Sequence, residues 1–85
     1  MDLAARRARI RDAALDYAPH FFELCDALYR HPEPSEQEHF ACALLTQKIA
    51  AHGFTVETPA AGLPTAFSAA RGTGTRRVAF AAEYD

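Results

Sequence analysis

The sequence is poor in the features that mark secreted, membrane and nucleic-acid-binding proteins. It has no tryptophan, one methionine and two cysteines among 85 residues, and its net charge is −2. Two cysteines without an apolar export signal indicate reduced thiols, so we expect a cytoplasmic protein. No apolar run approaches the ~18–20 residues that cross a bilayer, and the charge provides no general attraction for nucleic acid. We therefore expect neither a membrane nor a nucleic acid as partner.

The common metal-binding motifs are also missing. The four histidines are His20, His31, His39 and His52. None belongs to a His-Glu-x-x-His or Cys-x-x-Cys motif, and no two of them lie four positions apart. For three of the histidines a structural role is favoured over a functional one. His31 differs only because of the motif that surrounds it.

The composition is typical of a globular protein, with 49% hydrophobic and 24% charged residues. The first thirty residues have a helical period, because apolar residues recur there at spacings of four and three. Pro19 interrupts this pattern, so we expect either a kink or two abutting helices, the second of them capped by Asp16. The basic run at residues 6–11 is flanked by aspartates, which favours a solvated helix face over a nucleic-acid-binding arm.

A second helix is predicted over residues 35–52. Ser35 followed by Glu38 forms a capping box at its start. The prolines at positions 32 and 34 end the preceding helix, because the residue before a proline is pushed away from helical geometry. Gly53 follows the last turn and is expected to provide a left-handed C-cap.

Short extended segments follow Gly53. Strands are predicted over residues 54–58, 65–70 and 78–82, the last two pairing as an antiparallel hairpin around the turn at residues 72–75. The predicted fold class is therefore α/β, with two helices and then about three strands. Residues 78–82 are apolar on both faces, which is typical of a strand covered on both sides. Since the chain has too few elements to cover that strand, we expect further polypeptide to do so.

Glu83 and Asp85 are the strongest candidates for chemistry. They follow the last predicted strand, and catalytic groups of open α/β sheets gather beyond the carboxyl ends of strands. Residues i and i+2 of a strand project from one face, so both carboxylates are expected to point the same way. Two such charges repel unless a divalent cation joins them. Spacing alone leaves open the alternative that a strand simply ends in solvent.

Three segments resemble one enzyme family. Residues 28–38, Leu-Tyr-Arg-His-Pro-Glu-Pro-Ser-Glu-Gln-Glu, resemble the His-Pro-Glu-x-Ser-x-x-Glu motif of the aminoacylase–carboxypeptidase metallohydrolases. Residues 61–67, Ala-Gly-Leu-Pro-Thr-Ala-Phe, and residues 78–85, Val-Ala-Phe-Ala-Ala-Glu-Tyr-Asp, resemble the amidohydrolase branch of p-aminobenzoyl-glutamate hydrolases and related dipeptidases. The resemblance covers residues 17–85. Tyr29, where many relatives have His, and Pro34, where Leu is usual, depart from the pattern.

The resemblance implies a two-domain enzyme. Residues 1–85 would be the partial N-terminal segment of a zinc-peptidase-like three-layer α/β catalytic domain. The remainder of that domain and an inserted lid domain, which often mediates homodimer formation, would lie outside the chain. In the whole enzyme two divalent metal ions (zinc, manganese or cobalt) activate a water that attacks a small-molecule amide, with a glutamate as general base.

The resemblance also implies roles for individual residues. Asp85 matches the aspartate that orients a metal ligand, a supporting role without direct coordination. Glu83 stands where sister branches have a histidine ligand, and no metal ligand is assigned within residues 1–85. His31 and Glu33 would shape a loop near the site. In the family the ligands follow in an Ala-Leu-Pro and Cys-Gly-His continuation and in later segments.

Two hypotheses follow from different classes. The first is an N-terminal segment of a metal-dependent amidohydrolase or peptidase that cleaves N-acyl amino acids, aminobenzoyl-glutamate or dipeptides and is inactive by itself. The second is a free-standing protein-interaction module that docks through its amphipathic first helix and an open sheet edge.

Overall fold

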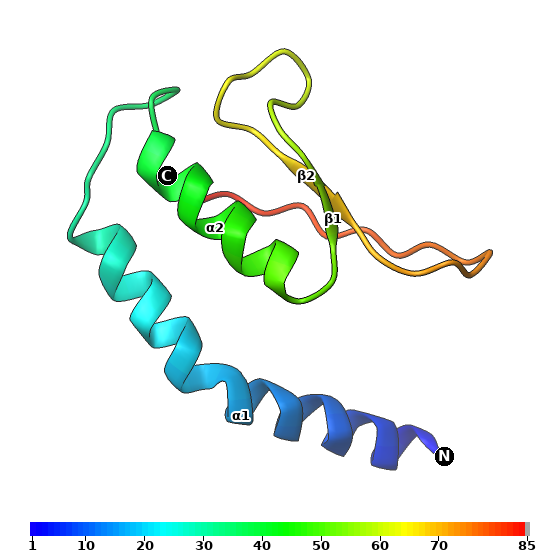
Figure 1. Ribbon diagram of the computed structural model, residues 1–85. Helices are drawn as coiled ribbons and strands as arrows, with labels where there is room; N and C mark the ends of the chain where they lie inside the picture. Colours follow the sequence, from blue (N-terminus) through cyan, green and yellow to red (C-terminus); the bar gives the residue numbers. More distant parts are fainter. Residues whose placement is uncertain (85) are drawn as a thin grey trace. The chain divides into compact units, whose positions relative to one another are not determined.

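The computed structural model describes residues 1–84 and contains two helices followed by a two-stranded sheet (Figure 1). The order is α1 (Leu3–Tyr29), α2 (His39–Ala51), β1 (Thr55–Glu57) and β2 (Ser68–Ala70). The expected mixed α/β class and the order of helices before strands are confirmed. The chain divides into two compact units, the first Met1–Arg30 and the second starting at His31.

The first unit consists almost entirely of α1. Asp2 caps the helix, because its carboxylate accepts a 2.7 Å hydrogen bond from the Ala5 amide. Pro19 lies inside the continuous helix, and Figure 1 shows α1 bending about midway along its length. Of the two expected outcomes, the kink is therefore the one found, since Asp16 lies within α1 and starts no second helix.

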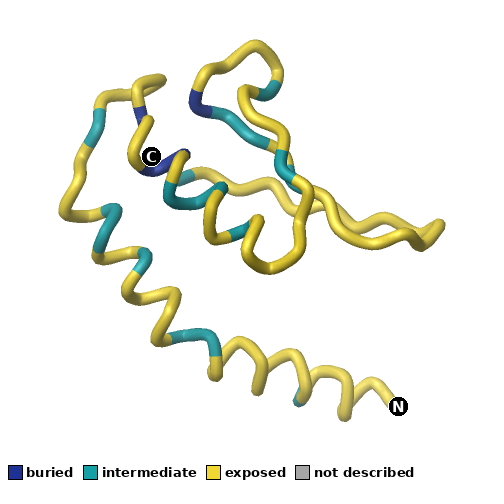
Figure 2. The backbone as a smooth tube through the Cα atoms, in the orientation of Figure 1, coloured by how far each residue is buried: buried dark blue, intermediate teal, exposed yellow. Residues whose placement is uncertain are grey.

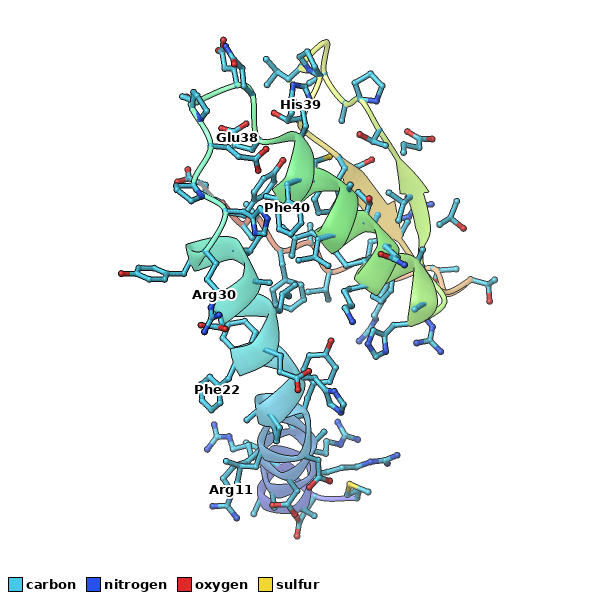
Figure 3. All side chains as sticks on the ribbon, turned by 60° about the vertical axis from the view of Figure 1, so that its left-hand side comes forward. Arg11, Phe22, Arg30, Glu38, His39 and Phe40 are labelled. Atoms are coloured by element: carbon cyan, nitrogen blue, oxygen red, sulfur yellow. The ribbon has the colours of Figure 1, made fainter. Side chains whose placement is uncertain are left out.

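No residue of α1 is buried. Figure 2 shows the helix as exposed along most of its length, and Figure 3 shows the ring of Phe22 projecting away from it. Ile10 is 71% exposed and Phe22 67% exposed. Cys25 is exposed, whereas Cys42 in α2 is buried; both are free thiols. None of the helices within residues 1–84 is both long and apolar enough to cross a membrane.

The second unit is built around α2 and the sheet. β1 and β2 are antiparallel, with Val56 opposite Ala69. The small core is Ala41 and Cys42 on α2, together with the polar residues Glu38 and Thr65. In Figure 2 the residues coloured as buried lie at the start of α2 and in the loop before β2.

The C-terminal end of α2 is as expected. Gly53 has a φ of +87°, the left-handed conformation that closes a helix. Arg71, directly after β2, donates a 2.9 Å hydrogen bond to the carbonyl of His52. Because helix ends leave carbonyls unpaired, this guanidinium stabilises the last turn and ties it to the sheet.

The predicted third strand is wrong for the residues that the structure describes. Residues 71–84 contain no strand and form an extended segment, drawn in orange to red in Figure 1. β2 pairs with β1 instead of forming a hairpin with residues 78–82. Val78 is 82% exposed and Phe80 is 93% exposed, and the alanines between and after them are also exposed, so the apolar run is uncovered on both faces. A strand needs a hydrogen-bonding neighbour, and none of the strands within residues 1–84 pairs with residues 78–82.

Candidate functional site

The loop before α2 is held by the carboxylate of Glu33. Its two oxygens accept hydrogen bonds from the amides of Phe40 at 2.8 Å and Ala41 at 3.0 Å. The bond from Phe40 is the largest cause of a pKa below the usual value for this carboxyl, and the charge of His39 adds to the effect. A carboxylate on the first amides of a helix also interacts favourably with the helix dipole. Glu33 therefore stabilises the start of α2 from outside the helix.

This arrangement corrects the predicted capping box. α2 begins at His39, not at Ser35, and its N-cap Glu38 makes no side-chain capping bond. Residues 35 and 36 form a turn, with Glu36 at a φ of +66°. Glu33 accepts hydrogen bonds from helix amides that usually bond to the side chain of the N-cap residue. The Glu38 carboxylate is therefore available for another partner.

His31 lies against the same helix start. Its imidazole stacks on the ring of Phe40, with centroids 3.9 Å apart and planes 16° apart. His31 and Glu33 thus both contact the first turn of α2, one through a ring and the other through hydrogen bonds. That His31 and Glu33 shape a loop near an active site stays a prediction.

Glu38 and Thr65 form a buried polar pair. The Thr65 hydroxyl donates a 2.7 Å hydrogen bond to one carboxylate oxygen of Glu38, and the Glu36 amide donates a 2.8 Å bond to the other. Glu38 is 9% exposed and Thr65 is 6% exposed. The bond from Thr65 is the largest cause of a pKa below the usual value for the Glu38 carboxyl. Figure 3 shows Glu38 together with His39 and Phe40 at the beginning of α2.

Tyr84 joins this pair from the C-terminal segment. Its hydroxyl donates a hydrogen bond to the backbone carbonyl of Thr65, and its ring stacks on Phe67 with a centroid distance of 6.1 Å. Burial raises the pKa of the Tyr84 phenol, and the neighbouring thiol of Cys42 raises it further. Cys42 in turn lies 3.7 Å from the hydroxyl of Thr58, measured from sulfur to oxygen.

The three segments that carry the family resemblance therefore meet in space. Glu38 belongs to the run at residues 28–38, Thr65 to the run at residues 61–67, and Tyr84 to the run at residues 78–85. Two hydrogen bonds connect them, from Thr65 to Glu38 and from Tyr84 to Thr65. We call this connected set the Glu38–Thr65–Tyr84 cluster.

Of the two carboxylates predicted to carry chemistry, the structure describes Glu83, which does not lie on a strand end. Glu83 is exposed and lies in the extended segment, so the premise that it projects from one strand face is wrong. Asp85 lies outside the residues that the structure describes. Within residues 1–84, no three His, Cys, Asp or Glu side chains gather closely enough to hold a metal ion. The described residues therefore do not fit a metal centre, and no chemical step is assigned to one here.

Sequence reasoning missed the importance of Thr65 and Tyr84 and gave Glu38 the wrong partner. Thr65 is predicted only as the first residue of the strand over residues 65–70, yet it is one of the two buried polar residues within residues 1–84. A signal was present in the sequence, since Glu38, Thr65 and Tyr84 each stand in a different motif segment. Their contacts span 27 and 19 positions, beyond the reach of local patterns.

Comparison with known proteins adds no relative. No protein-family model, no curated protein and no solved structure matches this chain.

Proposed function

We propose that this chain is the N-terminal segment of a metal-dependent amidohydrolase, with the zinc-peptidase-like three-layer α/β architecture that the motifs imply. The observation that supports the proposal is the Glu38–Thr65–Tyr84 cluster. Three short motifs are each weak evidence of a family, and their order in the sequence adds some weight. Their direct contact adds more, because segments that build one site must lie together in the fold.

In the proposed enzyme this chain contributes support, not coordination. Glu33 and Glu38 make the loop before α2 rigid, and Tyr84 ties the segment that carries Glu83 and Asp85 to that loop. Asp85 keeps the role implied by the resemblance, which is to orient a metal ligand. The metal ions, when bound in the whole enzyme, supply an activated water for attack on the amide carbonyl. Their ligands and the general base come from polypeptide beyond residue 85.

The test begins with the reading frame after the codon for Asp85. The proposal predicts a continuation through Ala-Leu-Pro and Cys-Gly-His. The longer polypeptide is purified with zinc, manganese or cobalt and assayed on N-acyl amino acids, dipeptides and aminobenzoyl-glutamate. We expect metal-dependent hydrolysis that Asp85→Asn reduces strongly, and no turnover by the 85-residue chain.

Two results contradict the proposal. Clear turnover by the 85-residue chain refutes the claim that it is catalytically incomplete, because a two-metal site needs several fixed ligands. A longer polypeptide that binds metal but hydrolyses none of these amides refutes the reaction class. Glu83→Gln serves as the matched variant, because it removes a neighbouring carboxylate to which the proposal gives no coordinating role.

A second candidate function is supported by the exposed surface of α1. Leu3, Ile10, Leu15, Phe21 and Phe22 are each at least half exposed. Such a surface is typical of a helix that docks on a partner. A stop codon after Asp85, together with a cooperative thermal unfolding transition of the isolated chain, favours this interaction module over the enzyme segment.

A further inference from the structure

The C-terminal segment is held at its start by the hydrogen bond from Arg71 to the His52 carbonyl, and near its end by Tyr84. Every residue from 71 to 83 is exposed, whereas Tyr84 is half-buried. Even the large apolar side chains of Val78 and Phe80 are in solvent. Tyr84 by contrast has a hydrogen bond to Thr65 and a ring contact with Phe67. The position of the segment's end therefore depends on Tyr84.

The acceptor of the Tyr84 bond is itself held in place. The backbone carbonyl of Thr65 accepts a hydrogen bond from Tyr84, and its side-chain hydroxyl donates a hydrogen bond to Glu38. Glu38 is fixed in turn, because its second carboxylate oxygen accepts from the Glu36 amide. When both oxygens of a buried carboxylate accept hydrogen bonds, the carboxylate has few alternative positions. Any other position would leave a buried polar group without a hydrogen-bond partner, which is unfavourable. Thr65 is thereby fixed through its side chain, and its carbonyl is presented to Tyr84.

We propose that Glu38 and Thr65 are positioning residues that act as a latch on Tyr84, and that this latch sets the location of the segment carrying Glu83 and Asp85. The latch itself follows from contacts within this chain. Its consequence for catalysis rests on the proposed amidohydrolase function, in which Asp85 must be held near the metal ligands. Closing the latch places the segment for catalysis, and opening it releases the segment at Tyr84, its only half-buried residue among positions 71–84.

The latch is tested in the 85-residue chain by NMR. Thr65→Val removes the hydroxyl that reaches Glu38 while keeping the size of the side chain, and Thr65→Ser is the control that retains the hydroxyl. Tyr84→Phe removes the other hydrogen bond. ¹⁵N relaxation at residues 81–84 reports the mobility of the segment.

We expect Thr65→Val and Tyr84→Phe to increase the mobility of residues 81–84 and to leave the amide shifts of β1 unchanged. Thr65→Ser should behave as the parent chain. Unchanged mobility in both Thr65→Val and Tyr84→Phe overturns the latch. If Thr65→Val unfolds α2, the result for Tyr84→Phe decides, because that change removes only one hydroxyl.

The consequence for catalysis is tested in the longer polypeptide. Tyr84→Phe should lower kcat by about threefold to tenfold, the loss expected for one hydrogen bond, with KM nearly unchanged. An unchanged kcat in a polypeptide whose parent is active overturns the positioning role. An inactive parent polypeptide refutes the amidohydrolase proposal instead, and the relaxation data still decide whether the latch exists.

Discussion

The hydroxyl of Thr65 donates a 2.7 Å hydrogen bond to the carboxylate of Glu38, although the two residues are 27 positions apart. This bond joins the loop before β2 to the start of α2 at the most buried place in the described chain. Tyr84 then adds the C-terminal segment to the same point through the Thr65 carbonyl. The polar contacts of the second unit are thus concentrated where two of its few buried residues lie.

Acidification should destabilise the second unit. The carboxyls of Glu33 and Glu38 both have a folded-state pKa below the ordinary value of 4.5. Their contribution is therefore complete above the unfolded-state pKa and is lost as the pH falls through the lower folded-state pKa. Thermal melts followed by circular dichroism between pH 7 and pH 3 should show a falling Tm below about pH 4.5. Glu33→Gln should lower Tm at pH 7 and flatten this dependence, and an equally steep profile in that variant contradicts the assignment.

Gly53→Ala should destabilise the chain by about 1 kcal/mol, because an alanine at a left-handed φ is strained. A Cβ at this position would lie 3.5 Å from the Arg71 side chain, an ordinary contact, so the cost comes from the backbone. Gly74→Ala is the matched control, since its φ is not in the left-handed region and no atom lies within 4 Å of the added carbon. Denaturant unfolding of the two variants measures the difference. Equal stability of both variants shows that the C-cap does not require glycine.

Arg71→Ala should lower the free energy of unfolding by about 0.3–1 kcal/mol, because it removes a cation from the C-terminal end of α2. The lost contact is the 2.9 Å hydrogen bond to the His52 carbonyl. Arg76→Ala changes the net charge equally in an exposed segment and should have no measurable effect. Increasing salt should reduce the difference between the two variants, since exposed charges are screened. A difference that persists unchanged at high salt argues against a charge interaction.

The exposed apolar side chains of α1 should bind hydrophobic dyes. Phe22→Ser removes a ring that is 67% exposed, so dye fluorescence and self-association at high concentration should fall. Stability should change by no more than about 0.5 kcal/mol, because little burial is lost. Ala5→Ser, at another exposed position of α1, is the control. A large loss of stability in Phe22→Ser shows that this face is covered in solution.

Features governed by local chemistry were predictable from the sequence. The kink at Pro19 and the C-cap at Gly53 follow from the backbone preferences of single residues. The extended segments after Gly53 were also placed correctly for β1 and β2, although each is shorter than predicted. These elements need only neighbouring residues to specify them.

Features that depend on distant partners were not predictable. Ser35 and Glu38 have the spacing of a capping box. However, the carboxylate of Glu33 accepts the hydrogen bonds from the first amides of α2, and Glu38 accepts a hydrogen bond from Thr65 instead. Residues 78–82 have the composition of a buried strand, yet they are exposed and pair with neither β1 nor β2. A strand and a buried carboxylate are both defined by what lies beside them, which a local pattern does not reveal.

The central claim is that the three motif segments meet at the Glu38–Thr65–Tyr84 cluster, and proton–proton NOEs in the isotope-labelled 85-residue chain test it most directly. The account predicts NOEs from the Tyr84 ring to the side chains of Thr65 and Phe67. An assigned Tyr84 ring whose only NOEs are to its sequence neighbours contradicts the account, because the C-terminal motif would then be detached from the other two.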